Sequence, residues 1–380
     1  MAGPLAGLRV IEVRGIGPGP YAGMVLADLG ADVVVVERAS SPSGLAPPAA
    51  ADAHMRGKRS IALNLKSPDG VEALLKLVET SDALLEGFRP GVAEKLGFGP
   101  ETCLKRNSRL VYGRVTGWGQ TGPLSGAAGH DINYISLTGA LAAIGITEKP
   151  TIPLNLIGDY AGGSLFLVVG MLAALLEAST SGRGQVVDAA ITDGSAHLMS
   201  LFHTLGSLGV WRTNRSANLL DGAAPFYDVY RTADNEFVSI GSLEPQFFAL
   251  LVERLSLDPE LFSNQHDSRR WPEMRDALER VFLSKTRAEW SELLEGSDVC
   301  FAPVHNFEEA PEHSHNRERE TYVDVGGLVQ PAPAPKFSET KPATPAPPRP
   351  EGSDTRALLV EIGFSNSEVD QLVATGAAFE

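Results

Sequence analysis

The sequence predicts an α/β protein with a Rossmann-like large domain and a smaller α+β domain. Short apolar runs such as 31–36 alternate with helical patterns along residues 8–189, which is typical of a parallel sheet covered on both faces. Near residue 210 this alternation ends. A hairpin pattern then follows, with strands at 226–230 and 236–240 around Ala233-Asp234-Asn235, and it indicates a second domain.

The individual elements can be assigned in chain order. Strands are predicted at 8–13, 31–36, 60–65, 83–88, 110–115 and 184–189. Helices are predicted from the Gly/Pro loop at 15–20 to Leu29, then at 68–78, 160–176, 193–208, 244–255, 271–283, 287–294, 355–362 and 367–374. The stretch 331–350 is dense in Pro and Ala and predicts an extended strap.

Composition excludes several classes of function. The chain has 380 residues and a formal charge of −15, which argues against nonspecific nucleic-acid binding and against an anionic membrane surface. Only Cys103 and Cys300 are present, so there is no disulfide framework and no metal-ligand spacing, and we expect a cytoplasmic protein without a metal. The uncharged stretch 160–176 is barely long enough for a membrane span and favours a buried helix.

The most informative run is Gly129-His130-Asp131-Ile132-Asn133-Tyr134, followed later by Gly158-Asp159. Glycine-rich loops let side chains approach a ligand closely. A histidine and a carboxylate on such loops suit proton transfer near neutral pH. The run therefore predicts an active site.

Each of these residues also has a structural interpretation. Asp159 precedes an apolar helix and is equally explained as its N-cap. His130 alone is equally explained as a core or turn histidine, and Asp131 as a residue that closes a turn through its own backbone. Glu244, in Leu243-Glu244-Pro245, is an acid at a helix start. Spacing alone leaves these alternatives open.

A dinucleotide site is a competing interpretation of the N-terminal region. Gly17-Pro18-Gly19-Pro20-Tyr21-Ala22 fits G-x-G-x-x-G/A, and Glu37 stands where a ribose-binding acid would be. However, Pro18 and Pro20 remove N–H donors from the turn that should bind pyrophosphate. A sterically tight turn is therefore favoured over an NAD site.

Basic residues gather near the predicted strand ends. Such a concentration in an acidic chain is what phosphate binding requires, although scattered surface charge explains the spacing equally well. The residues are Arg38, Arg56, Lys58, Arg59, Lys66, Arg89 and Lys95.

Several segments, taken together in their order and spacing, resemble CoA-transferase family III and, within it, the α-methylacyl-CoA racemases. The resemblance covers most of the chain, and the Gly-His-Asp-Ile-Asn-Tyr run points to the racemase branch. The other matching segments are 8–13, 17–20, 26–32, Glu37-Arg38, 56–60, 63–66, 86–92, 116–123, Gly158-Asp159, 218–222 and 224–227. Arg14 and the Pro-rich C-terminal region depart from the usual racemase pattern and leave the acyl preference open.

The resemblance implies an interlocked homodimer. It implies a large CoA-binding domain at 1–200, a linker at 201–224, a small α+β domain at 225–310, and a return strap at 311–380 that completes the large domain. His130 and Asp159 would form the proton-transfer pair, with Glu244 orienting the histidine. The expected CoA and loop contacts are Arg38, Ala62, Leu63, Asn64, Leu65, Gly87, Phe88, Arg89, Lys95, Gly129, Asp131, Asn133 and Tyr134.

The implied reaction interconverts (2R)- and (2S)-2-methylacyl-CoA thioesters through an enolate. Its oxyanion would be bound by backbone N–H groups near the start of the Asp159 helix. No cofactor is expected, because CoA is part of the substrate. The alternatives are a family III CoA-transferase with Asp159 as nucleophile, an NAD-dependent oxidoreductase, and a non-catalytic CoA-binding protein.

Overall fold

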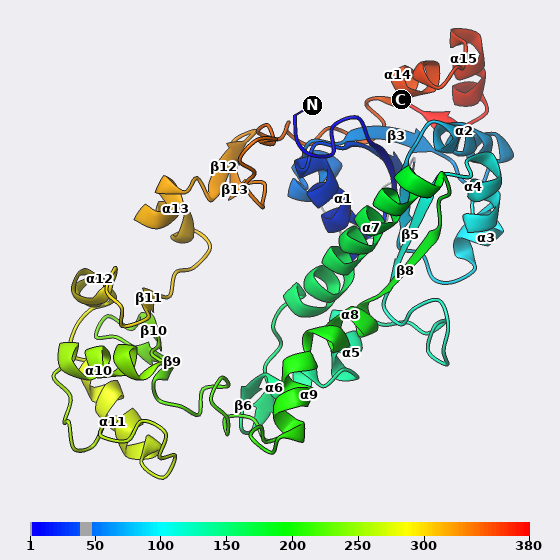
Figure 1. Cartoon of the computed structure of the whole chain (residues 1–380). Helices are drawn as coiled ribbons and strands as arrows, with labels where there is room; N and C mark the ends of the chain where they lie inside the picture. Colours follow the sequence, from blue (N-terminus) through cyan, green and yellow to red (C-terminus); the bar gives the residue numbers. More distant parts are fainter. Residues whose placement is uncertain (1, 39–47) are drawn as a thin grey trace. The chain divides into compact units, whose positions relative to one another are not determined.

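The computed structural model describes residues 2–38 and 48–380 and divides the chain into two compact units (Figure 1). Unit 1 comprises Met1–Ala140, Pro153–Met199 and Glu320–Glu380. Unit 2 comprises Leu141–Ile152 and Ser200–Arg319. The chain therefore passes from unit 1 to unit 2 twice, first for a short segment and then for most of unit 2, and its last segment completes unit 1.

Unit 1 is built on a seven-stranded sheet with the order β14-β3-β2-β1-β4-β5-β8. All neighbouring pairs are parallel except β14, which pairs antiparallel with β3. The predicted α/β class with a mainly parallel sheet is confirmed. The strands are β1 (Arg9–Val13), β2 (Asp32–Glu37), β3 (Arg59–Leu63), β4 (Ala83–Glu86), β5 (Val111–Thr116), β8 (Val186–Ala190) and β14 (Ala378–Phe379).

Both faces of this sheet are buried because side chains alternate along each strand. Ile11 and Val34 face one core, which is covered by helices α2 (Pro68–Glu79), α4 (Pro100–Arg106), α14 (Thr355–Glu361) and α15 (Asn366–Ala374). Val10 and Val33 face the other core, which is covered by α1 (Pro18–Asp28) and α7 (Phe166–Ser181). Continuous valine runs are thus explained by burial on two sides.

Two predicted helices differ in the structure. The helix expected at 193–208 is divided into α8 (Ile191–Leu198) and α9 (Ser200–Ser207). The apolar helix begins earlier than expected, as a π-helix, η3 (Leu156–Leu165), that continues into α7. Among the described residues, this continuous stretch Leu156–Ser181 is the one helix long and apolar enough to cross a membrane, and 44% of its most apolar window is buried.

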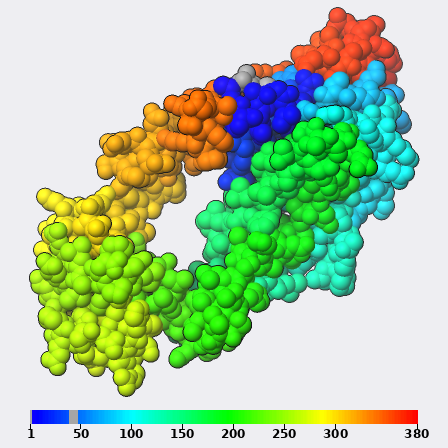
Figure 2. Space-filling view, viewed as in Figure 1, coloured from blue at the N-terminus to red at the C-terminus, as the bar shows by residue number. Residues whose placement is uncertain are grey.

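The C-terminal segment returns to unit 1 as predicted for an extended strap. After the hairpin β12 (Tyr322–Val325) and β13 (Leu328–Pro331), residues 332–354 contain no helix or strand. Figure 2 shows this segment in orange against the blue N-terminal residues. The Arg56 guanidinium donates to the Pro331 carbonyl at 2.7 Å, and the Gly57 N–H donates to the Ala346 carbonyl at 2.9 Å.

Unit 2 contains the predicted hairpin in an antiparallel three-stranded sheet. Its strands are β9 (Tyr227–Arg231), β10 (Phe237–Gly241) and β11 (Phe301–Pro303). Helices α10 (Pro245–Arg254), α11 (Trp271–Phe282) and α12 (Arg287–Leu294) pack on it around an aromatic core that includes Phe226, Tyr230 and Trp290. The remaining short elements are η1 (Ala49–Ala51), η2 (Ala53–Met55), α3 (Val92–Leu96), α5 (Asp131–Ser136), α6 (Ala140–Ala143), β6 (Gly145–Ile146), β7 (Lys149–Pro150), η4 (Ala310–Glu312) and α13 (Ser314–Glu318).

Candidate active site

Many of the expected site residues directly follow parallel strands of unit 1. Arg38 follows β2, Asn64 follows β3, and Gly87 to Arg89 follow β4. The sheet order reverses between β1 and β4, and ligands of open α/β sheets bind beyond the carboxyl ends of the strands at such a point. The topology therefore gathers residues far apart in sequence along one edge.

His130 is exposed at the start of α5. Its backbone N–H donates to the Asn133 side chain at 3.0 Å, so Asn133 stabilises the start of the helix, and its expected contact with a ligand stays a prediction. The Tyr134 hydroxyl donates to the Gly129 carbonyl, and the ring packs edge-on against Trp118 with centroids 4.8 Å apart. A Cβ on Gly129 would lie 2.7 Å from the Tyr134 ring, which explains this glycine.

Asp159 lies within the first turns of the π-helix η3 and is half-buried. Its interpretation as an N-cap is wrong, because the helix begins after Asn155. The Asn155 amide lies 3.5 Å from Oδ2 of Asp159. On the other side, a Cβ on Gly17 would lie 3.0 Å from the same oxygen, so the loop after β1 approaches the carboxylate closely. Single stretches of π-helix occur frequently at functional sites.

Asp131 and Asp159 are linked directly. The Asp159 backbone N–H donates to Oδ1 of Asp131 at 2.6 Å. Asp131 is only 7% exposed, and a Cβ on Gly158 would lie 2.2 Å from the same Oδ1. This N–H is therefore already occupied by Asp131, and the expected oxyanion role of backbone N–H groups near the start of this helix stays a prediction for the others.

The surroundings of Asp159 favour its neutral form more than water favours that of an ordinary aspartate. Burial, and then the negative charge of Asp131, raise the pKa of Asp159 to about 6, against smaller opposing effects of Asn155 and His130. Burial likewise raises the pKa of Tyr134, and the charge of Asp159 adds to this increase. A carboxyl group that titrates near neutral pH can both accept and donate a proton there.

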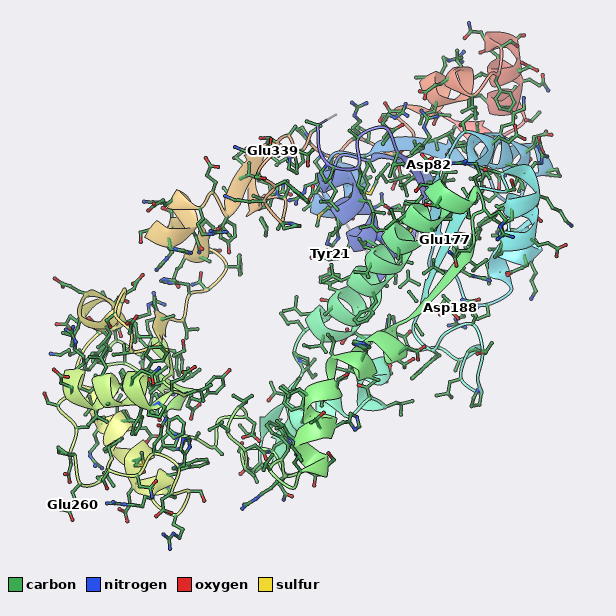
Figure 3. The ribbon with its side chains drawn as sticks, in the orientation of Figure 1. Tyr21, Asp82, Glu177, Asp188, Glu260 and Glu339 are labelled. Carbon is green, nitrogen blue, oxygen red and sulfur yellow. The ribbon has the colours of Figure 1, made fainter. Side chains whose placement is uncertain are left out.

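An aromatic cluster beside Asp159 was not predicted. Tyr21, labelled in Figure 3, stacks on Tyr160 with ring centroids 4.4 Å apart. The His54 ring meets Tyr160 edge-on, with Nε2 3.5 Å from the Tyr160 hydroxyl, and its Nδ1 lies 3.4 Å from Asp52. No spacing signal links these residues, because they come from α1, η2 and η3.

The loop with the dinucleotide-like spacing has other partners. Gly17 faces Asp159, and a Cβ on Gly23 would lie 1.8 Å from Oε2 of Glu12. Glu37 is buried and forms an ion pair with Arg14 and a hydrogen bond with the Ser60 hydroxyl. The acid proposed to bind a ribose is thus occupied by protein groups, and the NAD interpretation loses its support.

The basic residues divide into two groups. Arg56, Lys58 and Arg59 form ion pairs with Asp28, Glu12 and Asp32, each at 2.5 Å, and the first two are buried. Their interpretation as phosphate ligands is therefore wrong. Arg38, Lys66, Arg89 and Lys95 are exposed, and the Arg38 guanidinium lies 6.0 Å from the Phe88 ring centroid.

The remaining expected CoA contacts differ in accessibility. Ala62 and Leu63 are buried in β3 and pair with β14, while Asn64 and Leu65 are half-buried. A hollow of about 520 Å³ is lined by Leu65, Lys66 and Lys95 among others. Gly87 is exposed and Phe88 half-buried. This side of unit 1 has both space and positive charge for a phosphorylated ligand.

Glu244 belongs to unit 2, where it is exposed at the N-cap position of α10 without a side-chain capping bond. Its expected role in orienting His130 stays a prediction.

Comparisons with known proteins assign the family. The model of CoA-transferase family III matches residues 5–355. The chain belongs to this family. Within the family, the chain is 47% identical to the mouse α-methylacyl-CoA racemase and 44% identical to the human one, each over 97% of the chain and 96% of the relative.

Other family III proteins are more distant. The mouse succinyl-CoA:glutarate CoA-transferase is 29% identical over 98% of the chain and 90% of the relative. Among solved structures, a CaiB/BaiF family protein from Brucella suis matches with a TM-score of 0.81 and 24% identity over 95% of this chain and all of that one, which supports the fold. Rv3272 from M. tuberculosis matches with a TM-score of 0.75 and 29% identity over 93% and 98% of the two chains.

Proposed function

We propose that this family III protein is an α-methylacyl-CoA racemase, an isomerase that interconverts the 2R and 2S forms of 2-methylacyl-CoA thioesters. Identity of 44–47% to two racemases along nearly the whole chain supports the reaction class. The observation that carries the mechanism is the half-buried Asp159, whose pKa is about 6, beside the Gly129–Tyr134 run that contains His130. CoA enters as part of the substrate, and no cofactor is proposed.

The reaction needs two groups that exchange one proton with the α-carbon. The thioester carbonyl acidifies the α-C–H bond, one base removes the proton, and the electron pair passes into the enolate. Reprotonation on the opposite face restores the C–H bond with inverted configuration. We assign the two roles to His130 and Asp159, because imidazole and a carboxyl group of raised pKa each exchange protons near neutral pH.

The acyl-CoA would lie along the carboxyl edge of the unit 1 sheet. Arg38, Arg89 and Lys95 are exposed there and suit the phosphates, while the hollow that includes Leu65 offers space beside them. Glu244 is proposed to orient His130 in the assembled protein.

A deuterium-exchange assay tests the reaction. A single 2-methylacyl-CoA enantiomer incubated in D₂O should gain α-deuterium and lose optical purity without an added acid. His130→Ala should abolish both changes, whereas His315→Ala, at an exposed histidine of α13, should not. The alternative, CoA transfer with Asp159 as nucleophile, predicts movement of CoA onto an added carboxylate, with little dependence on His130 and no α-deuterium.

We also propose an interlocked homodimer. In unit 1, Val169 and Leu176 on α7 are 65% and 73% exposed. In unit 2, Leu201 on α9 is 53% exposed, and Leu208, directly after α9, is 68% exposed. Adjacent exposed apolar side chains of this size mark interaction surfaces. Sedimentation equilibrium should give twice the chain mass of 40.3 kDa, and a monomer at micromolar concentration would contradict the assembly.

A cytoplasmic location is proposed from the two cysteines. Both are free, with Cys103 buried and Cys300 exposed, which suits a reducing compartment. Cell fractionation tests this location, and recovery in an oxidising compartment would refute it.

A further inference from the structure

Asp131 contacts the proposed proton-transfer residue through the backbone. Its Oδ1 accepts the Asp159 N–H at 2.6 Å, and the Gly158 N–H also points to this carboxylate. Gly158 must lack a side chain, because a Cβ there would lie 2.2 Å from Oδ1. The carboxylate therefore fits tightly against the peptide that carries Asp159.

The second oxygen of Asp131 has no hydrogen-bond partner among the described residues, although it is buried. A buried carboxylate oxygen without a hydrogen-bond donor reduces stability, so its presence needs an explanation. The negative charge of Asp131 acts on Asp159, where it favours the protonated form. Two carboxylates that share a half-buried site rarely carry full charge together.

We propose that Asp131 is a positioning residue for proton transfer: its carboxylate holds the Gly158–Asp159 backbone in place, and its negative charge lies close to the carboxyl group of Asp159 and repels the negative charge that forms there. The inference rests on the proposed racemase function and adds a role for a residue first expected to contact the substrate. In one direction of the racemisation cycle, His130 removes the α-proton and the protonated form of Asp159 returns a proton to the other face.

Several groups among the described residues lie near Asp159. At and within α5, His130, Asp131 and Tyr134 are ionisable, whereas Gly17, directly before α1, and Asn155, directly before η3, are uncharged. From α8, the uncharged Ser195 packs against Gly162 of η3. Asp131 is thus the acidic neighbour whose removal should change the titration of Asp159.

Two substitutions separate the effect of the hydrogen bond to the Asp159 N–H from the effect of the negative charge. Asp131→Asn keeps an oxygen that can accept the Asp159 N–H but removes the charge, whereas Asp131→Ala removes both. Asp324→Asn is a matched control, because Asp324 also accepts a backbone N–H, from Gly327 at 2.9 Å, in a turn of the β12–β13 hairpin.

The first readout is the pH profile of α-deuterium exchange. In Asp131→Asn, the limb assigned to Asp159 should move to lower pH, with rates at its optimum reduced less than tenfold. Asp131→Ala should lose on the order of 10–100-fold at every pH, since a displaced acid or base loses about that much. A profile of Asp131→Asn that superimposes on the wild type would overturn the charge role.

The second readout does not depend on activity. Urea-denaturation midpoints are compared for Asp131→Asn, Asp159→Asn and the double variant at pH 8 and at pH 4.5. If the two carboxylates repel each other, the changes in midpoint of the single variants should not add up to that of the double variant at pH 8. They should add up at pH 4.5, where Asp159 is protonated. Additivity at both pH values would refute the proposal. Because this cycle needs no substrate, it distinguishes failure of the Asp131 role from failure of the racemase assignment.

Discussion

Lys58 Nζ lies 2.5 Å from Oε2 of Glu12, and both side chains are completely buried. The same ammonium donates to the Pro20 carbonyl at 3.0 Å, at the start of α1. Burial raises the pKa of Glu12 and lowers that of Lys58, and each charge offsets part of that effect in the other. Through the Pro20 carbonyl, this buried pair anchors the start of α1, which directly follows the loop that approaches Asp159.

Removing one partner of this pair should strongly destabilise the protein. Lys58→Met leaves the Glu12 carboxyl buried without its cation, which costs about 3–5 kcal/mol in the free energy of unfolding. Urea denaturation at pH 7 measures the loss. Lys105→Met, at an exposed pair on α4, serves as the control and should leave the midpoint unchanged. Full stability of Lys58→Met would contradict the arrangement.

Gly23→Ala should also destabilise the fold, for a steric reason. The added Cβ would lie 1.8 Å from Oε2 of Glu12 and 2.9 Å from Nζ of Lys58, so the ion pair must move. We expect a loss of roughly 1–3 kcal/mol, as for other overpacked cores. In Gly19→Ala on the same helix, the added Cβ would lie an ordinary 4.0 Å from a Leu85 methyl, and thermal denaturation should show no loss there.

The raised pKa of Asp159 predicts a pH-dependent cost in stability. The native carboxyl titrates at about 6, above its unfolded value, so native protein binds more protons between these pKa values. Stability from this group is complete at low pH and is lost as pH rises through 6. Asp159→Asn removes the loss and should gain roughly 1–2 kcal/mol relative to wild type at pH 8, compared with pH 4.5, after allowance for solvent screening of this half-buried group. Urea denaturation at the two pH values checks this, and a pH-independent difference would exclude it.

The exposed cationic side chains at the sheet edge should bind the CoA phosphates. Arg89→Ala and Lys95→Ala are each expected to raise KM for acyl-CoA about 5–20-fold with little change in kcat, because phosphate binding is equal in the ground and transition states. Steady-state kinetics with the corresponding pantetheine thioester, which lacks the nucleotide, should show no such increase. Lys105→Ala is the control on neighbouring α4, and an unchanged KM in both site variants would reject these contacts.

The elements with strong local patterns were predictable. Apolar runs such as Val33–Val36 became strands, and α12 begins and ends where its periodicity does, at Arg287 and Leu294. Strand β14 was missed because it has only two residues, and its pairing with β3 depends on the folded C-terminal segment. The π-helix was missed because its i+5 bond, from the Tyr160 N–H to the Asn155 carbonyl, leaves no period in the sequence.

The site was predictable as residue types but not as contacts. His130 and Asp159 stand out in glycine-rich runs, whereas the partners of basic residues lie far away in the sequence. Arg56 pairs with Asp28 and Lys58 with Glu12, separations of 28 and 46 residues that spacing does not reveal. The contact between Asp131 and the Asp159 N–H is of the same kind, because η3 and α5 meet only in the folded protein.

Strand β14 has a practical consequence for handling the protein. Ala378 and Phe379 occupy the outer edge of β3, so a fusion joined directly after them would start beside the sheet. Trimming the tail back to Gly376 would leave main-chain donors and acceptors of β3 bare, a template on which copies could stack into aggregates. Purification tags are therefore better attached at the opposite terminus.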